Sequence, residues 1–335
     1  MTPRRGLAFT LIAILCGLAL ALLVGPGDLG PGDVARVLAD HLGIHGSPTT
    51  PTADAIVWHL RLPRALLAAL IGAALGGAGA LTQGVFQNPL AEPGILGISA
   101  GAALAAVVGF ALGLDALGLW VTPGLAAAGA AVMLLLLIAL VGTRLEVATL
   151  LLAGVAIAAL ASAITTLLLA LNTERWDLGV RVMRWLMGSF EGRSWSHLAL
   201  GAPPILAGLS LAHWLRRDLD VLYLGTDTAR SLGVSLRRFH LLAILAIGLL
   251  VGTATALTGA IGFIGLVVPH LARLLVGATH RWLLPVAAIL GGLALLLVDT
   301  LTRALTSVVL PPGVITSLLG APFFLWLLAR GRQRR

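Results

Sequence analysis

Few side chains in this 335-residue sequence have the types and spacing that catalysis or metal binding requires. All 22 basic residues are arginine, so the lysine of a GxxxxGK[ST] phosphate-binding loop or of a Schiff base is missing. Cys16 is the only cysteine. His41 and His45 have the spacing of two metal ligands on a helix, but Gly43 lies between them in a polar, loop-like segment. We therefore expect this chain to bind no metal and no cofactor, and any ATP with its Mg²⁺ to be bound by a partner chain.

The acidic residues favour ion pairing over proton transport. Asp299 and Arg303 are four residues apart at one end of an apolar run, which predicts an ion pair on one face of a helix. No two carboxylates lie together within an apolar run, although proton-coupled pumps commonly use such carboxylates inside the membrane. The acidic side chains therefore argue against a proton-coupled pump.

The composition is that of a membrane protein. Hydrophobic residues make up 59% of the chain, charged residues only 11%, and the mean hydropathy is +1.01. A soluble domain has about 25% charged residues, so a soluble enzyme, a disordered chain and a disulfide scaffold are excluded. The pI of about 11.5 could suggest a nucleic-acid partner. The arginines, however, lie mostly in short loops between apolar runs, which indicates membrane topology and no nucleic acid.

Ten apolar runs follow one another, and a helix needs about 20 apolar residues to cross a bilayer. The first has the basic start of a signal peptide but no convincing small-x-small cleavage site, so we interpret it as a retained span. The eighth is short, contains Pro269, and is expected to cross only part of the bilayer. The runs are residues 6–24, 62–82, 95–114, 119–141, 147–171, 197–215, 240–257, 263–276, 282–301 and 314–329.

These runs predict an all-α polytopic membrane protein with about ten transmembrane helices in a single permease domain, residues 1–335. If both termini are cytoplasmic, most arginines lie in cytoplasmic loops, as the positive-inside rule requires. The sequence Ala-Leu-Thr ends the second run at Thr82 and the seventh run at Thr258, about half the chain apart. This recurrence suggests an inverted repeat of five plus five helices.

Two segments between runs have functional as well as structural interpretations. Gln83–Gly97 reads QGVFQNPLAEPGILG, and its prolines and glycines stop helices. It is either a tight connector or, because it is long and partly apolar, a re-entrant or gating loop. In the loop 216–239, Thr226 suits an N-cap and Gly233 fits just past a helix end, which predicts a short helix over 227–232. That helix is either solvated or docked into a groove on a partner.

The fifth run has one narrow face of small residues. Gly154, Ala158, Ser162 and Thr166 recur every four residues, and the last two make the face slightly polar. Small residues let helices approach closely in lipid, so the face is either a packing surface or the lining of a path at a dimer axis.

Long motifs along the chain resemble those of the FecCD-type permease subunits of ABC importers, which take up iron–siderophore complexes, haem and cobalamin. The resemblance runs from about Ala55 to Arg330. It is carried by RLPRALLAALIGAALGGAGALTQGVFQNPLAEPGILGISAGAA from Arg61, LLLAGVAI from Leu150, LMGSFEGRSW from Leu186, LGTDTARSLGVSL from Leu224, GAIGFIGLVVPHLARLL from Gly259 and LPPGVITSLLGAPFFLWLL from Leu310.

The resemblance implies a type II ABC importer permease with ten spans per subunit in the inner membrane of a prokaryote. It implies a homodimer with the pathway on its twofold axis, two ATPase subunits on the cytoplasmic face, a substrate-binding protein outside, and lipid around the helices. ATP hydrolysis would then take place on the partner chain, and this chain would be a translocation subunit.

The resemblance also implies roles for particular residues. Outer arginines would pair with glutamates of the binding protein: Arg61, Arg64 and Arg303. The segment that docks on the ATPase would include Gly225, Thr226, Asp227, Ala229, Leu232 and Gly233. The cytoplasmic gate would lie near Asn88, Leu90, Val147 and Ala148, and the pathway would run along Gly154, Ala158, Ser162 and Thr166. Val147 and Ala148 depart from the small hydroxyl residues expected at this gate in some relatives.

The function expected from these residues is import of an iron complex, either a siderophore or haem, with cobalamin as the alternative cargo. An ion-coupled secondary transporter is a more distant alternative, which the lack of buried carboxylates disfavours. A membrane-embedded enzyme is disfavoured because the sequence shows no metal motif and no pairing of a nucleophile with a base.

Overall fold

The computed structural model of the chain describes residues 2–25, 27, 29–44, 49–141, 147–305 and 310–332. Over these residues the chain forms helices and no strands, which confirms the expected all-α class. The α-helices are α1 (Pro3–Leu23), α2 (Pro31–His41), α3 (Pro51–Asp54), α4 (Leu62–Val85), α5 (Ile98–Ala111), α6 (Val121–Val141), α7 (Val147–Ala170), α8 (Trp176–Leu186), α9 (Trp195–Trp214), α10 (Arg216–Leu222), α11 (Thr226–Ser231), α12 (Leu236–Thr258), α13 (Ile264–Val276), α14 (His280–Leu305) and α15 (Pro312–Arg332). A π-helical turn, Ala55–Arg61, joins α3 to α4, and short 3-10 turns cover Pro93–Leu96 and Leu114–Leu117.

All ten apolar runs predicted from the sequence are helical. Within the described ranges, six helical segments are long and apolar enough to cross a membrane: α1, α3–α4, α6, α7, α12 and α14. The pair α9 and α10 passes the same test together, with a bend of 45° between them. Helices α5 and α13 are shorter, and in α15 the apolar segment is limited to Pro312–Leu327. The 13 residues of α13 rise about 20 Å, less than the roughly 30 Å hydrocarbon core, so this helix alone cannot cross, as expected for the eighth run.

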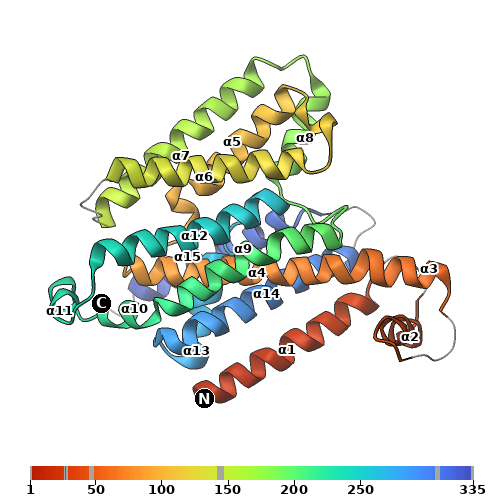
Figure 1. Cartoon of the computed structure of the whole chain (residues 1–335), viewed down its shortest axis with the longest axis horizontal. Coiled ribbons are helices and arrows are strands. Elements are labelled where there is room, and N and C mark those ends of the chain that lie inside the picture. Colours follow the sequence, from red (N-terminus) through yellow and green to blue (C-terminus); the bar gives the residue numbers. More distant parts are fainter. Residues whose placement is uncertain are drawn as a thin grey trace.

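Helix α4 lies at the centre of the bundle and packs against α9, α12, α13 and α14. Figure 1 shows α5, α6, α7 and α8 together on one side of α4, with α14, α13 and α1 on the other. We call the end of the bundle with α10 and α11 the α11 end, and the opposite end with α2 and α3 the α3 end (Figure 1).

The close packing of α4 on α14 depends on glycine. A Cβ atom at Gly72 would overlap the carbonyl of Gly291, and one at Gly76 would overlap the carbonyl of Ala287. Residues without a side chain let the two backbones meet, which is how helices associate when lipid supplies no hydrophobic driving force. These two helices therefore behave as one tightly packed unit through the length of the bundle.

The contacts between the halves fit the suggested inverted repeat. In a repeat of five plus five helices, α4 would correspond to α12 and α5 to α13. Helix α4 packs on α13, and α12 packs on α5, so these two contacts are equivalent under that repeat. The repeat itself stays a prediction.

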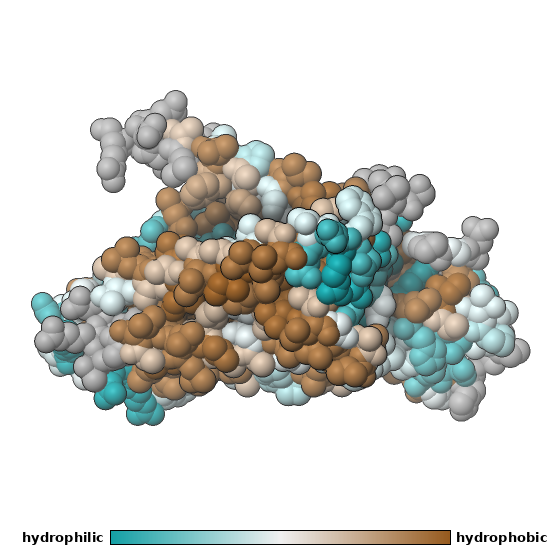
Figure 2. Space-filling model, turned by 90° about the horizontal axis from the view of Figure 1, so that it is seen from above, coloured by the Kyte–Doolittle hydropathy of each residue, from teal (hydrophilic) through white to brown (hydrophobic). Residues whose placement is uncertain are grey.

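The middle of the bundle presents apolar side chains to its surroundings. Leu15 on α1, Leu135 on α6 and Leu160 on α7 are each more than 60% exposed. Figure 2 shows hydrophobic residues over the middle of one face, a hydrophilic patch immediately to the right of them, and further hydrophilic residues at the lower left. The apolar middle is the part suited to lipid and to other apolar chains.

The short helix expected at 227–232 is present but begins one residue earlier. Its N-cap is Gly225, with φ +106°, and Thr226 is its first residue and makes no side-chain cap. Gly233 follows with φ +85°, as a C-terminal glycine should.

Of the two histidines considered as metal ligands, His45 lies outside the described residues. His41 stacks on Trp58, and its Nε2 lies 2.7 Å from Asp54 Oδ1.

Replacing Gly72 with alanine should destabilise the bundle. Alanine favours a helix by about 1 kcal/mol over glycine, but overpacking against the Gly291 backbone costs about 1–3 kcal/mol. Gly124 on α6 is the matched control, since a Cβ there meets nothing within 4 Å. We expect the apparent unfolding temperature in detergent to fall for Gly72→Ala and to hold or rise for Gly124→Ala. Equal temperatures for the two variants would contradict this account of the packing.

Candidate functional site

Four arginines surround a cavity of about 210 Å³ at the α3 end. Arg61 ends the π-helical turn, Arg64 lies in the first turn of α4, and Arg303 lies on α14. The structure therefore brings together the three arginines singled out in the sequence. The fourth, Arg193, comes from the connection between α8 and α9, within the LMGSFEGRSW motif, and was missed. Ile56, Leu60, Phe190 and Gly192 complete the lining.

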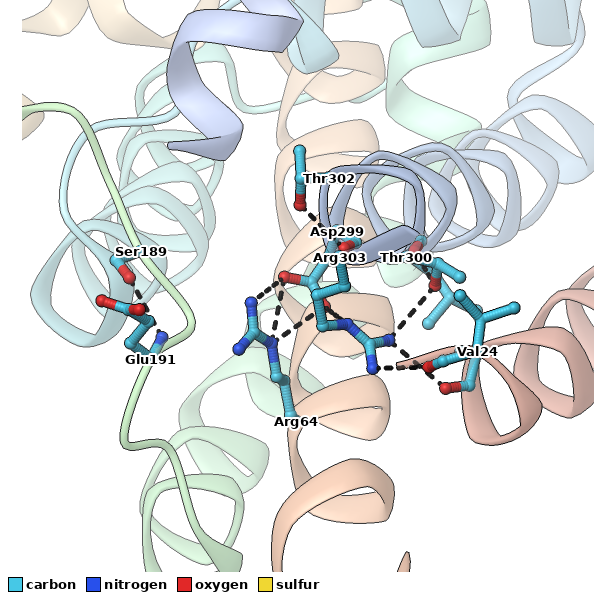
Figure 3. A network of polar contacts seen from close by, with 10 residues as sticks. Val24, Arg64, Ser189, Glu191, Asp299, Thr300, Thr302 and Arg303 are labelled. Carbon is cyan, nitrogen blue, oxygen red and sulfur yellow. Dashed lines mark hydrogen bonds and ion pairs between the residues drawn. The ribbon is translucent and has the colours of Figure 1, made fainter. Parts of the chain in front are cut away.

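A buried carboxylate holds two of these arginines in place (Figure 3). The Asp299 side chain is fully buried, and Arg64 donates to it from Nε at 3.0 Å and from Nη2 at 2.7 Å. Arg303 Nε lies 3.3 Å from Asp299 Oδ2, the oxygen that Arg64 Nε also contacts. The ion pair between Asp299 and Arg303 predicted from their spacing is confirmed. The stronger, two-pronged contact with Arg64 was not predictable, because the two residues are 235 positions apart.

Arg61 and Arg303 bind the end of α1. Arg61 donates to the carbonyl of Leu22 at 2.7 Å and to that of Gly25 at 3.0 Å. Arg303 donates to the carbonyl of Val24 at 3.0 Å. The last carbonyl groups of a helix lack partners within it and carry partial negative charge, so cations are favourable there. Both arginines therefore fasten α1 to the α4–α14 pair.

The three arginines thus have an internal structural role, which the sequence indicated only for Arg303 through its pair with Asp299, and their docking role stays a prediction. Arg193 differs from them. It is half-buried, and whereas the other three make hydrogen bonds through their guanidinium groups, Arg193 makes no hydrogen bond or ion pair with the described residues. Burial lowers the pKa of its guanidinium below the ordinary value. Of the four arginines around the cavity, Arg193 thus has the positive charge that contacts within the chain neutralise least.

At the opposite end, residues 86–97 form a compact connection after α4. Asn88 Oδ1 accepts from the N–H of Leu90 at 2.9 Å in a local turn, and both residues are exposed. Glu92 Oε1 accepts from the N–H of Phe263 at 2.8 Å, just before α13. The segment expected to form a connector or a gate is therefore bound to the other half of the chain, and its first residues, Gln83–Val85, still belong to α4.

The small-residue face of α7 divides into two parts. Gly154 is buried, because it packs against the backbone of Ile95 and Leu96. Ala158 lies beside it, next to Gly97. Ser162 and Thr166 are exposed, and the Thr166 hydroxyl donates to the carbonyl of Ser162 at 2.9 Å. The first half of the face is therefore a packing surface, and only the second half is open in this chain. Val147 and Ala148 form the start of α7, and Ala148 is exposed.

The short helix α11 presents a mixed polar and apolar surface. Thr226, Asp227, Leu232 and Gly233 are exposed, and Asp227 pairs with Arg230 at 3.1 Å. Gly225 is half-buried. Ala229 is fully buried, so it supports the helix from within, and its place in the docking segment stays a prediction.

One catalytic pattern in the sequence proves to be structural. Residues 97–101 read GISAG and match GxSxG, which in hydrolases places a serine on a turn between a strand and a helix. Here the residues open α5, and Ser99 Oγ lies 3.2 Å from Thr255 Oγ1 on α12. This pairing of hydroxyl groups links two helices and gives the serine no base.

Comparison with known proteins identifies similar chains over almost the full length. The model of the FecCD transport family matches residues 11–330. The vitamin B12 import system permease protein BtuC of Escherichia coli O9:H4 is 40% identical over 325 residues, covering 96% of this chain and 94% of that protein. BtuC of Yersinia enterocolitica is 46% identical over 284 residues, 83% of each chain. A solved structure described as an inward-facing conformation of a metal-chelate type ABC transporter superposes with a TM-score of 0.86. It is 30% identical and covers 98% of this chain and 99% of that one.

Removing the charge of Asp299 should unfold the α3 end. In Asp299→Asn the two arginines lose their buried counter-charge, and breaking a buried ion pair from one side costs about 3–5 kcal/mol. The matched control is Asp227→Asn, whose side chain is 93% exposed and whose pair with Arg230 should contribute about 0–1 kcal/mol. Thermal unfolding in detergent should separate the two variants clearly. A similar unfolding temperature for both would contradict the proposed importance of Asp299.

Proposed function

The chain belongs to the FecCD transport family and is an ABC importer permease of the inner membrane, and from this premise we propose that its cargo is cobalamin. The observation that carries the proposal is the likeness to vitamin B12 import permeases, which extends over nearly the whole of both chains at about 40% identity. This supports the alternative of the sequence analysis over the iron complex expected there. An iron chelate is the second candidate, because the similar solved structure is that of a metal-chelate type transporter.

We propose that the α11 end faces the cytoplasm and docks on a separate ATPase. Exposed Leu224 and Leu232 lie beside the charged Asp227, and Gly225 and Gly233 bound the helix. A short, well-bounded helix with apolar and charged side chains suits insertion into a groove on a partner. Two ATPase subunits would dock on the two copies of this chain in a homodimer, and ATP with Mg²⁺ would be bound by those subunits.

We propose that the α3 end faces outward and receives a substrate-binding protein. Four arginines around one cavity, against the single buried carboxylate of Asp299, leave an excess of positive charge that suits acidic side chains of a partner. Arg61, Arg64 and Arg303 would thus contribute charge while holding α1 in place.

The cargo path would follow α7 at the axis of the dimer. Ser162 and Thr166 are the exposed polar residues of its small-residue face, and Leu160 and Leu167 beside them are also exposed. The exit would lie near Asn88, Leu90, Val147 and Ala148, because the connection after α4 packs on the first half of α7 at Gly154. Docking of ATP-bound subunits at α11 would shift the connection after α4 relative to the start of α7, and this shift would release the cargo inward.

The test is reconstitution of this chain in lipid vesicles with its ATPase and binding protein, offering cobalamin, a ferric siderophore and haem in separate experiments. We expect cobalamin alone to stimulate ATP hydrolysis and to accumulate inside the vesicles. Stimulation by a ferric complex and not by cobalamin would replace the proposed cargo with the second candidate. Full uptake with a catalytically inactive ATPase would instead reject ATP-driven import and favour an ion-coupled transporter.

Charge reversal at Arg193 should weaken docking without unfolding the chain. Since its Nε has no hydrogen-bond partner among the described residues, Arg193→Glu removes few internal contacts but reduces the positive charge of the cavity. We expect the association rate with the binding protein to fall about tenfold at low salt, and the difference to shrink at high salt. The control is Arg36→Glu, because Arg36 lies on α2, does not line the cavity, and pairs with Asp33. Equal association rates for wild type and Arg193→Glu at low salt would remove Arg193 from the docking surface.

A further inference from the structure

Gln87 has an unusual backbone conformation at the end of α4. Its φ is +48°, and it is one of two non-glycine residues with positive φ in the described part of the chain. The N–H of Asn88 donates to the carbonyl of Gln83, and that of Gln87 to the carbonyl of Gly84, so Gln87 is the left-handed residue of a Schellman C-cap. Glycine usually takes this position, because a Cβ atom disfavours left-handed backbone. A glutamine held here suggests that its side chain is needed.

The side chain of Gln87 reaches the turn between α10 and α11. Its Nε2 donates to the carbonyl of Leu222 at 2.8 Å, and the same carbonyl accepts from the N–H of Gly225 at 3.0 Å. Leu222 is buried, and Gly225 is the N-cap of α11. The Gln87 amide is therefore fixed to the residue from which the exposed helix begins.

A second contact binds the same turn to α14. Asp220 on α10 accepts from the N–H of His280 at 2.9 Å, and the same carboxylate oxygen lies 2.7 Å from His280 Nδ1. His280 is the first residue of α14 and is fully buried. An acidic side chain at a helix N-terminus satisfies a free N–H and complements the helix dipole. Helix α10 is thus held by the end of α4 through Gln87 and by the start of α14 through Asp220.

The other left-handed residue, Phe263, lies in a separate connection, between α12 and α13, and is the N-cap of α13. Its N–H donates to Glu92, five residues after Gln87. Between these two contacts are Asn88 and Leu90, the residues assigned to the inner gate. Backbone strain that persists in a structure often marks a functional segment, and here both strained residues take part in hydrogen bonds that anchor residues 87–92.

We propose that Gln87 is a positioning residue that couples α11 to the gate. When the α10–α11 turn moves, the Gln87 amide transmits the movement to residues 88–92, and Glu92 transmits it to the start of α13. The hydrogen bonds of Asp220 to His280 hold α10 against the start of α14. The proposal rests on the proposed function, since it requires α11 to be the element on which the ATPase acts. It assigns to the Gln87 side chain a role in linking ATP hydrolysis to transport, beyond the closure of a helix end.

Three substitutions separate the hydrogen bond from the backbone conformation. Gln87→Glu keeps the size of the side chain but presents an acceptor to the Leu222 carbonyl. Gln87→Asn tolerates left-handed backbone but is one methylene shorter. Gln87→Gly relieves the strain and removes the amide, so it should fold at least as well as the wild type. Asn172→Asp is the matched control, since Asn172 lies in the turn just past α7, at the opposite end of that helix from the gate, and its amide donates to the carbonyl of Leu168.

The measurement is cargo uptake per ATP hydrolysed in vesicles that contain the assembled transporter. For all three Gln87 variants we expect ATP hydrolysis within about twofold of the wild type and uptake per ATP lowered about three- to tenfold, as the loss of one hydrogen bond in the coupling step allows. Asn172→Asp should match the wild type. If Gln87→Gly retains full uptake per ATP, the amide is not needed and the proposal is wrong.

A second measurement follows the gate directly. In a Cys16→Ser background, Leu90→Cys should change its rate of reaction with a water-soluble thiol reagent when ATP is added, and this change should be lost with Gln87→Gly. An unaltered change in that double variant would also overturn the proposal. If wild-type uptake proves independent of ATP, the proposed function fails instead, and the two failures are therefore distinguishable.

Discussion

Helix ends buried in a membrane protein must find hydrogen-bond partners within the chain, because hydrocarbon offers none and each unpaired backbone group costs several kcal/mol. Here side chains from distant helices supply many of those partners. Arg61 and Arg303 donate to the last carbonyl groups of α1. Asp220 accepts from the first N–H of α14, and Glu92 accepts from the N–H that precedes α13. Several of the few charged residues of this chain therefore lie where helices end, and these same places are its candidate functional sites.

The glycine contacts between α4 and α14 connect the two sets of helix ends. At the α3 end this pair carries the ion pair of Arg64 with Asp299, and at the α11 end it carries Gln87 and His280. Two backbones in direct contact cannot slide past each other without a clash, so the pair moves as a unit.

The parts of this fold that could be predicted from the sequence are those encoded locally. Lipid requires about 20 apolar residues per crossing, and this requirement located the ten apolar helices but not α2, α3, α8 or α10. The pair of Asp299 with Arg303 follows from their spacing on one helix, and Gly233 indicated the end of α11 to within a residue. Contacts between distant segments are not encoded in this way. Arg64 reaches Asp299 from the other half of the chain, and Gln87 occupies a position where local rules expect glycine.

The arginine cavity illustrates why a structural role and a docking role are compatible in the same residues. A flexible surface arginine loses side-chain entropy when a partner binds, and this loss reduces the affinity. Arg61, Arg64 and Arg303 have already lost that freedom, since each is held by hydrogen bonds to α1 or to Asp299. Their positive charges are therefore fixed in position before a partner arrives. The single negative charge of Asp299 neutralises only part of this positive charge. An acidic side chain entering this cavity would meet an excess of positive charge that needs little reorganisation, which is the arrangement that favours fast and specific association.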